Sequence, residues 1–66
     1  MTPHDKVIYI IQQLEISDSK VARAIQKSVS TATHKRLRLR DNKFTEEDYQ
    51  RIRDFYLEKL RKIEML

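Results

Sequence analysis

The chain contains no glycine, and its only proline is Pro3. β-Hairpins rely on glycine and similar turn residues for backbone with positive φ, so a β-sandwich or barrel of this size would need several of them. The glycine-rich loops that hold nucleotide phosphates cannot be built from this chain either. A helical domain needs few glycines, and the sequence therefore predicts an all-α fold.

The length of 66 residues limits the chain to one domain, residues 1–66. A core of this size is marginally stable, and the absence of cysteine removes disulfide bonds and thiolate chemistry. Oligomerisation is the remaining common way to stabilise so small a domain, so we expect a homodimer. The longest apolar run, Val7–Ile11, is five residues and too short for a membrane span. No signal-peptide pattern is present either, so we expect a cytoplasmic protein with no membrane partner.

Capping residues and apolar spacing predict a small bundle of four to five helices, in which the C-terminal helix is the longest. Four of them are placed at about residues 3–14, 17–26, 28–37 and 45–64. The residues expected to cap their N-termini are Thr2, Ser17, Ser28 and Thr45. Pro3 suits the first helical position, because the N–H that it lacks would have no partner there. We expect His4 to be an exposed residue of the first turn.

The second and third predicted helices are short, and they meet at a short polar break formed by Gln26, Lys27 and Ser28. Two short helices joined by a tight turn are typical of a helix-turn-helix unit. The third helix has little apolar content beyond Val29 and Ala32, so we expect it to bury one narrow edge. Such a helix leaves most of its surface free for a ligand, and the alternative is a short, poorly packed connector.

The net charge of +4 is concentrated in one segment of the chain. Residues 27–43 hold six basic side chains against a single acidic one, Asp41, while the flanking segments are close to neutral. This excess indicates where a polyanion would bind, although a solvated basic loop has the same pattern. Within it, residues 36–40 alternate between arginine and leucine. That alternation suits a strand or extended arm, or else the frayed end of the preceding helix with Leu37 in the core.

The predicted C-terminal helix carries an apolar stripe that is longer than three short helices can cover. The stripe consists of Tyr49, Ile52, Tyr56, Leu60 and Ile63, at spacings of three and four residues. Its first part, Tyr49 and Ile52, fits ordinary core as well as it fits an interface. The last part is a candidate dimer interface, formed by Tyr56, Leu60, Ile63 and Leu66.

Three segments together resemble small DNA-binding proteins of the phage repressor and Cro type, which have the lambda-repressor-like helical fold. They are Asp18–Ile25, with the small Ala22 where two helices would cross, Ser28–His34 and Lys43–Ile52. The likeness covers about residues 5–57. The sequence departs from the family pattern at Gln26, which replaces the usual glycine of the turn, at Lys27, which replaces an apolar residue, and at Ala32, which is smaller than the usual isoleucine or valine.

The resemblance implies a transcriptional regulator, expected to be a repressor from a phage or mobile element, that binds double-stranded DNA sequence-specifically in the nucleoid. The residues that would read bases are Val29, Ser30, Thr33 and His34. The residues that would hold phosphates are Ser17, Ser19, Lys35, Arg36, Arg38, Arg40 and Lys43. A two-fold dimer would place its third helices about 34 Å apart, which is one turn of DNA.

Other classes of function have weaker support in the sequence. The alternative kept beside DNA binding is a small protein–protein interaction module or inhibitor that docks through its amphipathic C-terminal helix. RNA-binding proteins usually stack bases on exposed aromatic side chains, which here are expected on core faces. An enzyme, a metal site, a cofactor and a small-molecule substrate are not expected, because the chain has no cysteine, only two histidines and no converging carboxylates.

Overall fold

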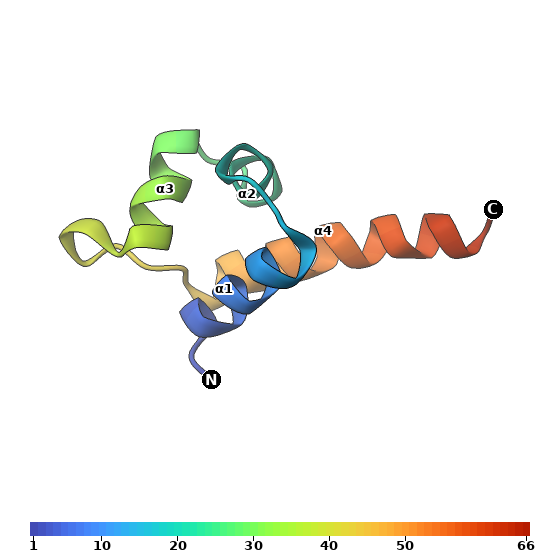
Figure 1. Cartoon of the computed structure of the whole chain (residues 1–66), viewed down its shortest axis with the longest axis horizontal. Helices are drawn as coiled ribbons and strands as arrows, with labels where there is room; N and C mark the ends of the chain where they lie inside the picture. The colour runs from blue at the N-terminus through green and yellow to red at the C-terminus, as the bar shows by residue number, and fades with distance from the viewer.

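The computed structural model describes all residues, 1–66, and contains helices but no strand (Figure 1). In chain order the elements are α1 (Pro3–Leu14), α2 (Asp18–Ile25), α3 (Val29–Leu37), the 3₁₀ turn η1 (Leu39–Asp41) and α4 (Glu46–Glu64). The predicted all-α fold with a long C-terminal helix is therefore confirmed. No helix of the structure is both long enough and apolar enough to cross a membrane.

Each α-helix begins directly after a residue whose side chain caps it. Thr2, Ser17, Ser28 and Thr45 have extended backbone, and each side chain accepts the N–H of the residue three positions later. At α4 the cap is reciprocal, because Asp48 also accepts the N–H of Thr45 at 3.0 Å. The helices α2, α3 and α4 start one residue later than the predicted ranges, since a capping residue lies outside the helix that it caps.

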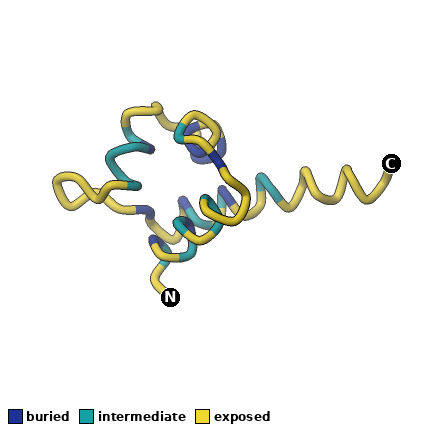
Figure 2. Tube along the Cα trace, in the orientation of Figure 1, coloured by how far each residue is buried: buried dark blue, intermediate teal, exposed yellow.

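The core is small and lies where α1, α2 and the first half of α4 meet. Its largest fully buried side chains are Phe44, Ile25, Ile52, Val7 and Val21. The helix α4 packs against α1 and α2, and α3 packs against α2. Figure 2 shows the buried positions gathered where these elements meet. Burial of each large apolar side chain contributes about 1.5–3 kcal/mol to the free energy of unfolding. Because the core contains few such side chains, each of them is important for stability.

His4 is buried, and the expectation of an exposed first-turn residue was wrong. Only 7% of its surface is accessible, and its ring stacks on Phe44 with 5.5 Å between the ring centroids. Its Nδ1 accepts the backbone N–H of Phe44 at 3.1 Å. The two residues are 40 positions apart. Only the packing of α1 beside the start of α4 brings this partner to the ring, and no local pattern in the sequence signals it.

The segment between α3 and α4 forms neither a strand nor an extended arm. The helix α3 ends at Leu37, whose side chain is 52% exposed and does not enter the core. Arg38, Arg40 and Asp41 have positive φ, at 56°, 54° and 63°. A residue with a Cβ loses roughly 1–2 kcal/mol in this conformation. The backbone is therefore strained at the place where the exposed arginines lie.

The second half of α4 projects away from the rest of the molecule (Figure 1, Figure 2). All positions from 57 to 66 are exposed, and they include Leu57, Leu60 and Ile63. An ion pair of 3.7 Å between Lys62 and Glu58, four residues apart on the helix, supports the helical conformation there. Phe55 and Tyr56, where this half begins, pack against the core, whereas Leu57, Leu60 and Ile63 are largely exposed.

Candidate nucleic-acid interface

The helices α2 and α3 form a helix-turn-helix pair whose two members pack directly against each other (Figure 1). The chain reverses at Gln26, which has left-handed backbone with φ 61° and ψ 43°. The N–H of Gln26 bonds to the carbonyl oxygens of Ala22 and Arg23 and so ends α2. Ser28 then accepts the N–H of Thr31 at 3.1 Å and starts α3. Backbone bonds and a cap thus close the turn without the usual glycine.

The helix α3 buries little of its surface completely. Ala32 is its only buried residue. Near its N-terminus, Val29 is 48% exposed and Ser30 is exposed, and His34 is partly exposed one turn further along. Three of the four residues predicted to read bases therefore lie at accessible positions of α3.

Thr33, the fourth residue predicted to read bases, is bonded inside the protein. Its hydroxyl donates to Oδ2 of Asp18 at 2.7 Å. Arg36, a predicted phosphate contact, donates to the same carboxylate from Nε at 2.7 Å and from Nη2 at 2.9 Å. The Arg36 bond, helped by Thr33 and opposed by burial, holds the pKa of Asp18 below its ordinary value. Asp18 therefore fixes α3 against the start of α2 and leaves Nη1 of Arg36 free.

Lys35, another predicted phosphate contact, is paired with Asp48 at the start of α4. The two side chains are 16% and 5% exposed. Burial raises the pKa of Asp48, but the bonds from Lys35 and Thr45 together lower it more, so the pKa lies below its ordinary value. The ammonium group of Lys35 is thus directed at a carboxylate, and it links α3 to α4.

The remaining predicted phosphate contacts lie at the surface. Arg38, Arg40 and Lys43 are exposed, form no ion pair and follow α3 in the strained segment. Ser17 and Ser19 are exposed at the start of α2. The Oγ of Ser17 is also occupied as the cap of α2. Of the predicted phosphate contacts, Arg38, Arg40, Lys43 and Ser19 are therefore free, Ser17 caps α2, and Lys35 and Arg36 are held by carboxylates within the chain.

Two residues that organise this surface, Asp18 and Asp48, were not identified as organisers from the sequence. Both occupy the first turn of a helix, where a carboxylate suits the positive end of the helix dipole. Their partners Arg36 and Lys35 are 18 and 13 residues away, at separations that no local rule covers. The excess of cations in residues 27–43 is the one signal that some of them need internal partners.

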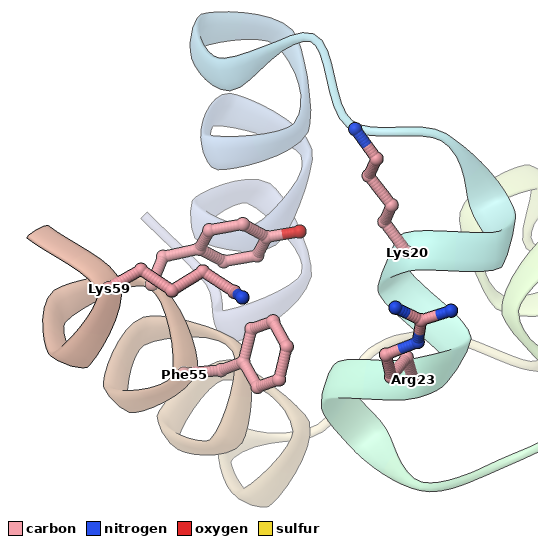
Figure 3. Close-up of a pocket in the computed structure, with 5 residues that line it drawn as sticks. Lys20, Arg23, Phe55 and Lys59 are labelled. Carbon is pink, nitrogen blue, oxygen red and sulfur yellow. The ribbon is translucent and has the colours of Figure 1, made fainter.

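A hollow of about 240 Å³ lies elsewhere on the surface, between α2 and α4. It is lined by Phe55 and Tyr56 and by three cations, Lys20, Arg23 and Lys59 (Figure 3). The Nζ of Lys59 lies 4.7 Å from the centroid of the Phe55 ring. None of the three cations pairs with a carboxylate. Histidine and carboxylate side chains nowhere gather in a group of three or more that could hold a metal ion.

Comparison with known proteins adds no relative to this description. No protein-family model, curated protein or solved structure matches the chain. The class that the fold and these positions define is a small all-α domain with a helix-turn-helix pair. Any assignment of function therefore depends on the residues themselves.

Proposed function

We propose that this protein binds double-stranded DNA sequence-specifically and represses transcription, with α3 as its recognition helix. The observation that carries the proposal is that α3 is buried only at Ala32 and leaves Val29 and Ser30 exposed. A helix with one exposed side fits the major groove of B-DNA, which is about 12 Å wide. The resemblance to the phage repressor and Cro type supports the same class, and such a protein acts in the nucleoid.

Base reading is assigned to the exposed side of α3. Val29 offers methyl groups to a thymine methyl, while Ser30 and His34 donate to or accept from base edges. Thr33 already donates to Asp18 at 2.7 Å. A hydroxyl oxygen has two lone pairs, so Thr33 still accepts a hydrogen bond from an adenine or cytosine amino group.

Phosphate binding is assigned mainly to the free cations that follow α3. Arg38, Arg40 and Lys43 have no carboxylate partner to give up, so their binding of a phosphate releases counterions without breaking an internal bond. Ser17 and Ser19 contribute at the start of α2. Lys35 and Arg36 act chiefly by holding α3 in place.

The proposed active form is a homodimer that associates through Tyr56, Leu60, Ile63 and Leu66. Support comes from the projecting half of α4, where Leu60 is 50% and Ile63 is 61% exposed. Removal of a contiguous apolar stripe from water is favourable. Two copies give the two recognition helices that a palindromic site requires.

The test is selection of bound sites from randomised duplex DNA, with sedimentation of the same sample. We expect a two-fold symmetric motif, bound by two chains. Val29→Ala and Ser30→Ala should change the selected bases, whereas the matched control Ser19→Ala should weaken binding without changing the motif. Salt-sensitive binding without a motif would overturn the sequence specificity. Absence of binding at physiological salt would overturn the DNA-binding function.

A second candidate function is a protein–protein interaction module that docks through α4. The observation that favours it is the projecting helix itself, which would fit a groove on another protein as well as it fits a second copy. Leu60→Gln with Ile63→Gln separates the two candidates, and Leu14→Gln at a 49% exposed position of α1 is the control. Self-association that only the double variant removes supports the dimer, and a monomeric wild type favours a different protein partner.

A further inference from the structure

Leu37 is the last residue of α3, and its side chain does not belong to the hydrophobic core. It is 52% exposed. A single exposed leucine is common on protein surfaces, so its exposure alone does not mark a binding site. Its position on the helix is more informative, because a helix turns by roughly 100° per residue and this rotation decides which residues share a face.

Leu37 shares the outward face of α3 with Ser30 and His34. Ala32 is fully buried and marks the side of the helix that faces the molecule. Around the helix axis, Leu37, Ser30 and His34 lie at roughly 140°, 160° and 200° from Ala32. The three side chains therefore form one row on the side opposite Ala32, which we call the outer ridge.

The polar members of the outer ridge have no partner within the chain. The side chains of Ser30 and His34 take part in no hydrogen bond and no ion pair. Arg38, Arg40 and Lys43 follow α3, and all three are exposed cations without an ion pair. Phosphates line the major groove of DNA, so this charge favours a duplex as the partner of the ridge.

The length of the outer ridge matches a short run of base pairs. A helix rises by about 1.5 Å per residue, so Ser30 and Leu37 lie about 10.5 Å apart along its axis. Successive bases of one DNA strand are about 3.4 Å apart. When α3 lies along the groove, the ridge therefore covers about three base-pair steps, and His34 lies between its two ends.

We propose that Leu37 is a further base-reading residue: its side chain contacts the methyl group of a thymine, about two to three base pairs from the base that Ser30 contacts. The inference deepens the proposed function and rests on it, because it names a base that α3 selects. In the major groove only thymine carries a methyl group, and an apolar side chain is the chemical partner of that group. Ser30 and His34 supply the hydrogen bonds of the same ridge.

Selection of bound sites with Leu37→Ala tests the contact. We expect this variant to lose about fivefold of the wild-type preference for thymine at one position and to keep the rest of the motif. Leu39→Ala is the matched control, because Leu39 is 44% exposed but lies in η1, beyond the end of α3. The control should select the wild-type motif. A Leu37→Ala variant with the wild-type motif, or a control that loses the same thymine, would overturn the inference.

Deletion of the methyl group from the DNA tests the same contact from the other side. Replacement of that thymidine by deoxyuridine removes only the methyl group. Measured by fluorescence anisotropy, the replacement should weaken binding of the wild type about fivefold and binding of Leu37→Ala by less than about twofold. Equal losses in the two proteins would assign the methyl contact to another residue and overturn the inference.

The two proposals fail separately in these experiments. A wild-type protein that selects a motif, but binds its thymidine and deoxyuridine forms equally well, overturns this inference and leaves the proposed function standing. That measurement requires no variant, so it does not depend on how well Leu37→Ala folds. A wild-type protein that selects no motif overturns the proposed function, and this inference with it.

Discussion

Asp18 and Arg36 form a two-point contact that sets the orientation of α3 on α2. Nε of Arg36 donates to Oδ1 at 2.7 Å, and Nη2 donates to Oδ2 at 2.9 Å. The planar guanidinium matches the two carboxylate oxygens, so the contact fixes an angle as well as a distance. Asp18 would itself repel a DNA phosphate. Its value to the proposed interface is therefore that it positions the recognition helix.

Asp18→Asn is expected to lower the free energy of unfolding by about 1 kcal/mol, because the contact is charge-assisted but only partly buried. Urea denaturation monitored by circular dichroism measures this change. Asp54→Asn is the control, since Asp54 pairs with Arg53 at a 66% exposed position and should change stability by less than about 0.5 kcal/mol. Equal losses in the two variants would show that the Asp18 contact is worth no more than a surface pair.

Acid is expected to destabilise the fold through Asp48. The pKa of Asp48 lies below its ordinary value in the folded protein. An unfolded aspartate titrates at about pH 3.9, so the unfolded chain takes up the proton first as the pH falls. Stability that is present above about pH 4 is then lost below it.

Asp48→Asn should reduce this acid sensitivity. The variant leaves Lys35 without its charged partner, so we expect it to be about 2 kcal/mol less stable at pH 7. Thermal unfolding between pH 7 and pH 2.5 is the measurement. The variant should lose less stability than the wild type as the pH falls. Identical pH dependence in the two proteins would refute the role of Asp48.

Protonation of His4 is expected to cause a second loss of stability as the pH falls, and this loss begins at a higher pH than the loss caused by Asp48. Burial lowers the pKa of His4, Arg38 and Lys43 lower it further, and Asp5 opposes them. The unfolded chain therefore takes up this proton first, at about pH 6.5, and stability is lost as the pH falls through the lower folded pKa. NMR titration should place the His4 midpoint below 6.5. In His4→Gln, the loss of stability between pH 7 and pH 5 should shrink.

Arg38→Gln combined with Arg40→Gln is expected to weaken binding to all DNA sequences alike. Each phosphate contact contributes about 0.9 to the slope of log affinity against log salt, so the double change should flatten it by up to about 1.8. Fluorescence anisotropy over a range of salt concentrations measures the slope. Arg53→Gln with Arg61→Gln, on α4, is the control pair. An unchanged slope would show that Arg38 and Arg40 do not contact DNA phosphates.

Gln26→Gly is expected to stabilise the protein by about 1 kcal/mol. The left-handed backbone of Gln26, with φ 61°, costs a residue with a Cβ more than it costs glycine. In a domain of this size such a change raises the melting temperature by about 4–8 °C. The control Lys27→Gly, where φ is not positive, should lower the melting temperature instead. A lower melting temperature for Gln26→Gly would contradict this account of the turn.

The helical class and the starts of the helices could be predicted from local sequence. A cap such as Thr45 bonds to an N–H only three residues away, so its signature is complete within a short stretch of chain. The apolar stripe along α4 is likewise a property of residue spacing. The accessible places of Val29 and Ser30 on a weakly apolar helix were also predictable, because they depend on local composition.

The partners of the charged and polar groups, in contrast, depend on the packing of the helices. Lys35 and Arg36 belong to the same basic run as Arg38, yet the first two are held by carboxylates and the third is free. His4 likewise meets its stacking partner Phe44 only because α1 packs beside the start of α4. These contacts join residues 13 to 40 positions apart. They depend on how whole helices pack, and a local pattern carries no information about that.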